Sequence, residues 1–295
     1  MPEEIKKAII CPNCKKLISS YNQTCPHCGI KKPERTHNII RVFGGSRLNF
    51  VKIIITANIV LFTLCYLLPF ILPEHQVPAN KGLLGILPSP SVVSLHLLGW
   101  ADPHQILNGS WWLLITAIFL HGGVLHILFN MMWFKDLGPT TQELFSPHKM
   151  VIIYLISGVM GNLLAVLNPS IMGLFSILIR PAPIIGASGA VFGLIGAIIA
   201  FGKKSGGLYG RHLVRQLGLW AIILIVMGFI IPGISNAAHI GGFITGFVIG
   251  YLLPVRASQS SELKFVIIAV ILYLIIGYAY FRVIINLIRV ILKLH

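Results

Sequence analysis

Seven long apolar stretches, separated by shorter polar segments, occupy most of the chain after residue 50. A helix that crosses a bilayer needs about 20 predominantly apolar residues. The second stretch is interrupted by Gly122 and Gly123, and the last carries Arg282 and Arg289, which is also compatible with a helix lying along the membrane surface. The pattern predicts membrane-spanning helices at residues 50–72, 111–134, 150–167, 184–201, 213–231, 237–253 and 265–285.

The composition excludes a soluble multidomain protein. Of the 295 residues, 56% are hydrophobic and only 11% are charged, and the mean hydropathy is +0.85. Soluble domains carry about 25% charged residues. The first fifty residues are polar and basic, without the early apolar segment of a secretory signal peptide. The expected fold class is therefore an all-α polytopic membrane protein.

The basic residues indicate which side of the membrane each loop faces. Nine Lys and Arg residues precede residue 50 and four follow the fourth stretch, whereas residues 73–110 carry only Lys81 and residues 232–236 carry none. Because basic loops stay in the cytoplasm, the N-terminus is predicted to be cytoplasmic. The protein itself is expected in the plasma (cytoplasmic) membrane. The same retention accounts for the net charge of +15, so no nucleic acid is expected as a partner.

Ser188 and His239 open the fourth and sixth apolar stretches. Stretches two apart cross the bilayer in the same direction, so both residues are expected at similar depth near the outer face. A hydroxyl and an imidazole placed together are what nucleophilic catalysis with a general base requires. The alternative is that each satisfies backbone groups between helices, as polar side chains in membranes often do.

Small residues recur every four positions after both Ser188 and His239. The fourth stretch has Gly, Gly and Ala at 189, 193 and 197, and the sixth has Gly at 242, 246 and 250. This spacing lets two helices pack closely, so we expect the contact to hold Ser188 against His239. Phe192, one turn after the serine, is expected to lie under the imidazole ring.

His126 and Asn130 are four residues apart and therefore share one face of the second predicted helix. Near its outer end they would donate to a developing oxyanion together with the Ser188 amide; the alternative is hydrogen bonding between helices. His121 either lines the site or faces the interface. The two aspartates of the chain are Asp102, in the first loop, and Asp136, at the inner end of that helix. We therefore expect a Ser-His dyad without a third member, although Asp102 stays open.

The N-terminal segment carries a separate pattern. Two Cys-x-x-Cys units, formed by Cys11 with Cys14 and by Cys25 with Cys28, lie ten residues apart. Four thiolates at this spacing suit a tetrahedral structural zinc, and the alternative is a set of unmetallated thiols. About thirty residues cannot build a core alone, so the metal would supply the folding energy. We expect a small zinc ribbon that is structural or docks a cytoplasmic protein partner.

These motifs together resemble the rhomboid family of intramembrane serine proteases. The resemblance covers about residues 50–254 and rests on Gly-Ala-Ser-Gly at 186–189, on His239 with the glycines after it, and on His-Ile-Leu-Phe-Asn at 126–130. It implies a six-helix rhomboid core. The seventh helix, with the loop before it at 255–295, would be a C-terminal addition. A zinc-ribbon head at 1–35 and a basic linker at 36–49 would precede the core.

The resemblance also implies a function. Ser188 would be the nucleophile and His239 the base of a serine endopeptidase, with His126, Asn130 and the Ser188 amide as the oxyanion hole and no cofactor for catalysis. Family substrates are transmembrane proteins, cut near the outer membrane face. The chain departs from the common family pattern at Leu113, where many relatives have Arg, and at Phe192, where many have Tyr.

Two rival interpretations come from different classes of protein. A transporter or channel would have polar groups across the whole bilayer, whereas here they gather near one face. A catalytically silent rhomboid-like adaptor would bind transmembrane clients without cutting them. A serine-directed activity probe separates this adaptor from a protease.

Overall fold

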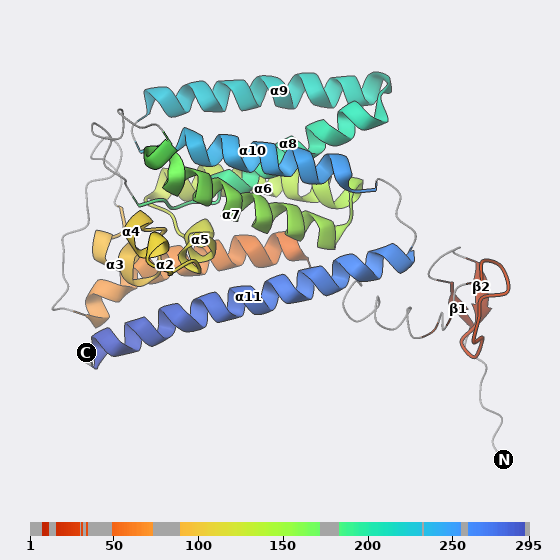
Figure 1. Cartoon of the computed structure of the whole chain (residues 1–295), viewed down its shortest axis with the longest axis horizontal. Helices are drawn as coiled ribbons and strands as arrows, with labels where there is room; N and C mark the ends of the chain where they lie inside the picture. The colour runs from red at the N-terminus through yellow and green to blue at the C-terminus, as the bar shows by residue number, and fades with distance from the viewer. Residues whose placement is uncertain are drawn as a thin grey trace, which may run out of the picture.

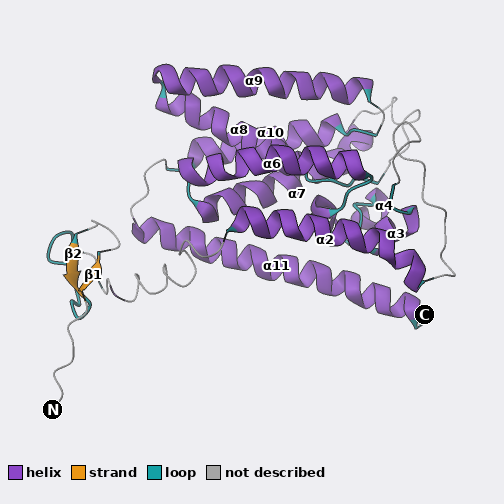
Figure 2. Cartoon of the chain, turned by 180° about the vertical axis from the view of Figure 1, so that it is seen from behind, coloured by secondary structure: helices purple, strands orange, loops and turns teal. Residues whose placement is uncertain are grey.

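The computed structural model describes residues 8–11, 16–29, 31, 34, 49–72, 89–171, 183–231, 233–254 and 259–292. In these residues the chain is an all-α bundle preceded by a small hairpin of β1 (Ala8–Ile10) and β2 (Leu17–Ser19). Seven of the described helices have at least 17 residues, namely α2 (Phe50–Ile71), α6 (Val124–Leu144), α7 (Pro147–Ile171), α8 (Ser188–Ser205), α9 (Gly207–Ile230), α10 (Asn236–Leu252) and α11 (Gln259–Ile291). Figures 1 and 2 show these long helices lying roughly alongside one another.

The helices confirm a multi-pass membrane fold. In the described residues α2, α7, α9 and the Glu262–Ile291 part of α11 are long and apolar enough to cross a bilayer, while α10 is apolar but has only 17 residues. The expected seventh helix is present and, at 33 residues, is the longest of the described helices. Its length corresponds to about 50 Å at 1.5 Å per residue, more than the roughly 30 Å of hydrocarbon.

The second predicted stretch is broken at Gly122 and Gly123, as its sequence indicates, but the helix after the break extends beyond residue 134 to Leu144. The apolar residues Leu113–Thr116 and Ala117–Phe119 form a short α-helix (α5) and a 3-10 turn (η3), bent by 90° from α6. The bend falls at the Leu-His-Gly-Gly sequence of 120–123. Helix α6 begins only after Gly123, and it continues two turns past Asp136 because Pro139 is accommodated within it. Together the two helical pieces on either side of the bend are apolar enough to form one broken membrane span.

Helix α8 is the centre of the bundle. Every residue from Gly189 to Gly202 is buried, and the helix packs against α6, α7, α9 and α10. By contrast α9 buries only one face, formed by Gly210, Leu213, Leu217 and Ala221. In Figure 1, α9 lies along one side of the bundle and α11 along the opposite side.

The glycine spacing has the consequence that the sequence predicts. A Cβ atom added to Gly242 would overlap the backbone of Gly189, one added to Gly246 would overlap Gly193, and one added to Gly250 would overlap Ala197. Both helices therefore advance four residues per contact in the same direction, so α8 and α10 are parallel and in direct backbone contact. This register aligns the beginnings of the two helices.

Short helices connect α2 to α6 on the side of the bundle where α8 and α10 begin. They are α3 (Val92–Leu97), α4 (Pro103–Leu107), α5 and η3. Backbone hydrogen bonds join Ala101 and Ile184 in both directions, at 2.9 and 3.0 Å. The Gly186 amide donates to the Ala117 carbonyl at 2.9 Å. The segment leading into α8 is thus held by the segment leading into α6.

Candidate active site

Ser188 is the first residue of α8, directly after a tight turn. Gly186 has a φ of +120°, a conformation that glycine adopts far more readily than other residues. Ala187 is the N-cap of α8 and makes no side-chain capping hydrogen bond. The first amide groups of a helix have no acceptor within it, and the helix dipole makes this end positive. The turn therefore places a hydroxyl beside backbone donors that suit a developing negative charge.

His239 lies in the first turn of α10, against the same end of α8. Its ring stacks on Phe192, with ring centroids 4.2 Å apart and an interplanar angle of 13°. The carbonyl of Ala238 lies 3.3 Å from the position of a Cβ atom built on Gly189. The structure thus brings the residues flanking Ser188 into contact with His239 and its neighbour, and the predicted position of Phe192 is confirmed.

The imidazole of His239 is buried, with 6% of the residue exposed. Among the described residues it makes no hydrogen bond, either to Ser188 or to a carboxylate, and its Nδ1 is enclosed without a partner. Catalytic hydrogen bonds are often long before substrate binds and tighten in the complex. Packing, chiefly the Phe192 ring, therefore holds this imidazole in place.

His126 completes the cluster from α6. Its Nδ1 accepts a hydrogen bond from the Gly122 amide at 3.3 Å. A neutral imidazole with one nitrogen accepting carries its proton on the other. That Nε2 lies 2.6 Å from the position of a Cβ atom built on Gly186. His126 therefore directs an N–H donor toward the turn that carries Ser188.

Asn130 and His121 both contact His126, one through its backbone and the other through its ring. The Asn130 side chain donates to the His126 carbonyl at 2.8 Å, which ties it to its own helix and leaves one N–H of the amide for another acceptor. His121 is fully buried, and its ring lies edge-on to that of His126 with centroids 5.0 Å apart. Of the two positions considered for His121, the structure shows the buried one beside His126 rather than the interface. The Gly-Gly break beside it, which turns the chain inward, was the available signal.

The aspartates lie elsewhere in the fold. Asp102 is the N-cap of α4, where its carboxylate accepts from the Gln105 amide at 3.0 Å. Asp136 lies more than two turns beyond His126 on α6, and its carbonyl accepts from Thr140. In the described residues the ion pair is Lys149 with Glu262, on other helices. Asp102 therefore caps a short helix, and Asp136 lies away from His126 along α6.

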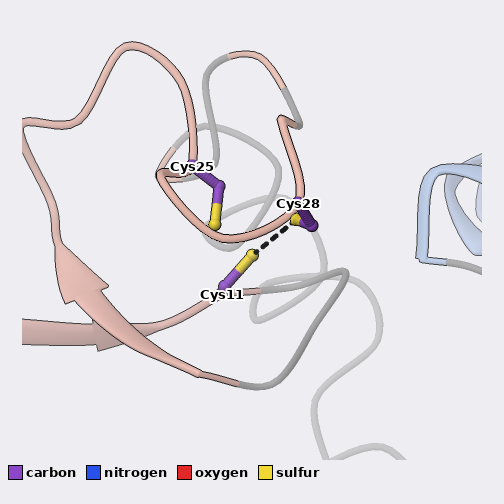
Figure 3. A group of neighbouring side chains, drawn as sticks. All are labelled: Cys11, Cys25 and Cys28. Atoms are coloured by element: carbon purple, nitrogen blue, oxygen red, sulfur yellow. Dashed lines mark hydrogen bonds between the residues drawn. The ribbon is translucent and has the colours of Figure 1, made fainter.

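The N-terminal cysteines form a second cluster, drawn in Figure 3. The sulfur atoms of Cys11, Cys25 and Cys28 lie within 4.8 Å of one another, and those of Cys11 and Cys28 are 3.7 Å apart. A tetrahedral zinc with bonds of about 2.3 Å separates its sulfurs by about 3.8 Å. The His27 amide donates to the Cys25 sulfur at 3.4 Å. These three residues fit a metal centre, and Cys14 lies outside the described residues.

Comparison with known proteins bears on the membrane part of the chain. The Rhomboid domain model matches residues 108–256, which is 149 of the 295 residues. RHOMBOID-like protein 4 of Arabidopsis thaliana is 34% identical over 185 residues, covering 62% of this chain and 43% of the relative. Rhomboid protease GluP of Bacillus subtilis (strain 168) is 25% identical over 252 residues, covering 85% of this chain and 44% of the relative.

A third relative is named as an inactive protein. Inactive RHOMBOID-like protein 8 of Arabidopsis thaliana is 33% identical over 174 residues, covering 58% of this chain and 46% of the relative. This chain thus spans a little under half the length of each of these three relatives. The matched residues contain the whole cluster of His126, Asn130, Ser188 and His239. With a family model that covers just over half of its length, this chain belongs to the rhomboid family.

Proposed function

We propose that the chain is an intramembrane serine endopeptidase that cuts transmembrane proteins near the outer membrane face. The observation that carries the proposal is the convergence of three elements at the start of α8. These are the uncapped turn with Ser188, the Nε2 donor of His126, and the Phe192-stacked ring of His239. Membership of a family in which a relative is named as a protease supports it further.

In this mechanism Ser188 is the nucleophile and His239 the general base. His239 takes the hydroxyl proton as the Ser188 oxygen attacks the scissile carbonyl carbon. His126, Asn130 and the Ser188 amide donate to the resulting oxyanion. His239 then gives the proton to the leaving amine as the C–N bond breaks, which leaves an ester on Ser188. Water, again deprotonated by His239, hydrolyses that ester and restores the hydroxyl.

We propose that the chain is divided into the same domains that the sequence pattern predicts. Residues 50–254 form the catalytic core, 255–295 the loop and additional helix, 1–35 the head and 36–49 its linker. The basic segments before residue 50 and after α8 support a cytoplasmic N-terminus. In that orientation Ser188 and His239 open toward the outside, from a chain embedded in the plasma membrane.

A serine-directed fluorophosphonate probe tests the protease directly. We expect it to label the wild-type chain in membranes and to lose that labelling in Ser188→Ala, together with cleavage of a single-pass reporter. Ser157→Ala is the control, because Ser157 is a fully buried serine of α7 whose hydroxyl makes no hydrogen bond in the described residues. Equal labelling of wild type and Ser188→Ala would refute the proposal.

One relative supports a second candidate function. Because a rhomboid-like protein 33% identical to this chain is called inactive, the adaptor that binds transmembrane clients without cutting them is the competing proposal. It predicts that client proteins are retained by the wild type and by Ser188→Ala alike. It also predicts that no probe labelling occurs in either.

We also propose that Cys11, Cys14, Cys25 and Cys28 hold a structural zinc in the head. Support comes from the spacing of the three described sulfurs and the hairpin that presents Cys11. The zinc takes no part in catalysis; when bound it would fold the head and let it dock a cytoplasmic protein. Metal analysis of the purified chain should find about one zinc per chain, and a metal-free, folded head would contradict this.

A further inference from the structure

The additional helix α11 packs against the segment that leads into the candidate active site. The guanidinium carbon of Arg282 lies 3.9 Å from the centroid of the Trp112 ring, and the guanidinium donates to the Tyr278 hydroxyl at 3.0 Å. The Tyr278 ring stacks on Trp111, with centroids 5.8 Å apart and an interplanar angle of 15°. We call these four residues, two from α11 and two directly before α5, the aromatic clamp.

The clamp lies at the outer edge of the membrane under the proposed orientation. Glu262, near the start of α11, pairs with the buried Lys149 of α7. Arg282 follows twenty residues later, which is about 30 Å along a helix and equals the hydrocarbon thickness. A cation at this depth can reach the interface, and Trp rings gather there. The two ends of α11 are thus fastened at opposite faces of the bilayer.

Backbone hydrogen bonds connect the clamp to the nucleophile. Trp112 leads into α5 and η3, and the Ala117 carbonyl in η3 accepts from the Gly186 amide, two residues before Ser188. The Thr116 hydroxyl donates to the Gly99 carbonyl, and a Cβ atom built on Gly99 would lie 2.9 Å from a methyl group of Val283 on α11. Each link consists of a buried polar contact or close packing, so movement of Trp112 would be passed on to the turn.

We infer that Arg282 is a positioning residue, which holds the Ser188 turn in its reactive geometry by fixing Trp112 and, through α5 and η3, the Gly186 amide. The inference rests on the proposed protease function. A cation over a Trp face supplies a directional contact that an apolar side chain cannot.

The test compares Arg282→Ala, Arg282→Lys and Arg289→Ala in the full chain, reconstituted in vesicles. The substrate is a quenched fluorescent single-pass peptide with alanines at its outer end, and active sites are counted with the fluorophosphonate probe. Arg289 is the matched control, because it lies two turns further along α11 and makes no hydrogen bond or ring contact with the described residues.

We expect Arg282→Ala to lower kcat per active site by roughly 3- to 30-fold, with KM little changed. This range corresponds to the free energy that a cation–π contact contributes. Arg282→Lys should recover part of the loss, since it keeps the cation but not the planar stacking. In a Trp112→Leu background, Arg282→Ala should add little. An unchanged kcat, a loss shared by Arg289→Ala, or a fall only in the number of active sites would overturn the inference.

Failure of the proposed protease has a different signature. If the wild-type chain neither cleaves the peptide nor reacts with the probe, the proposed protease function is refuted. Hydrogen exchange then tests separately whether Arg282 holds the Ser188 turn in position. Amides of residues 113–119 and 184–186 should exchange faster in Arg282→Ala than in the wild type or Arg289→Ala. Equal exchange in all three would overturn the inference whether or not the chain is a protease.

Discussion

At the scale of single residues, the candidate site depends on Gly186 more than on its neighbours. Gly186 combines a left-handed backbone with a position directly against the His126 ring. Either feature alone would favour glycine, and together they leave no room for a Cβ atom. Gly189 packs against α10, as the four-residue spacing of small residues predicts. The two glycines around Ser188 therefore serve different purposes, one in the turn and one in helix contact.

Gly186→Ala should abolish most of the activity. The new methyl group would both strain the backbone, at a cost of roughly 1–3 kcal/mol, and push the His126 Nε2 away from the turn. Displacements of about 1 Å can cost about 100-fold in rate, so we expect a fall of that order in peptide cleavage. Gly206→Ala is the control, because Gly206 also has a positive φ, +64°, but open space around it. Similar activity in both variants would contradict the role given to the His126 contact.

At the scale of elements, the α8–α10 contact sets the geometry of the site. The carbonyls of Gly189 and Gly193 face glycines of α10 so closely that the helices meet backbone to backbone. Since the two helices are parallel and begin with Ser188 and Asn236, this contact sets the height of His239 relative to the nucleophile. The start of α10 must therefore match the start of α8.

Gly246→Ala should force α8 and α10 apart. We expect a destabilisation of roughly 1–3 kcal/mol, the usual cost of overpacking, together with reduced probe labelling. The measurement is the thermal or denaturant midpoint in detergent. Gly218→Ala, in α9 with nothing within 4 Å of the added Cβ, should change stability by less than about 0.5 kcal/mol. A Gly246→Ala protein as stable as Gly218→Ala would show that the contact is not tight.

At the scale of the whole molecule, the chain combines a bilayer-stabilised bundle with a small head of different chemistry. The bundle buries His121 and His239 near the start of α8 and α10 and Lys149 near the start of α7, and its outer helices expose large apolar side chains such as Phe229 and Leu274 to lipid. Among the described residues of the head, the buried cluster consists of Cys11, Ile18 and Cys25, with Ile9 and Cys28 packed against it. Such a core is too small to stabilise a fold without a metal or another crosslink.

Zinc removal should therefore affect the head and spare the core. A chelator, or Cys11→Ser, is expected to release the metal and make the head sensitive to protease, because zinc binding provides its folding energy. Probe labelling of Ser188 should persist within about twofold, a difference of roughly 0.4 kcal/mol. Cys65→Ala, which removes a buried thiol of α2, is the control and should keep the zinc. Chelation that abolished labelling would show that the head and core are coupled.

Much of this architecture was predictable from the order of residues. The apolar stretches correspond to the long helices, and the glycine spacing correctly paired α8 with α10. The position of Phe192 beneath His239 also followed from helical periodicity. The sequence indicated the break at Gly122 and Gly123 but not the 90° bend there or the extension of α6 to Leu144, because hydropathy cannot tell a crossing helix from an apolar segment that turns across the bundle. The catalytic roles of Ser188, His239, His126 and Asn130 remain predictions for the variants above.

By itself the sequence determined which segments enter the bilayer and how close α8 and α10 can approach. Partition into lipid and backbone approach depend on the composition and spacing of a single segment. Only the tertiary structure decided that Nε2 of His126 faces Gly186, that His121 is buried beside it, and that Arg282 of α11 covers Trp112. Those contacts join residues far apart in the chain, and no local pattern specifies which face of one element meets another.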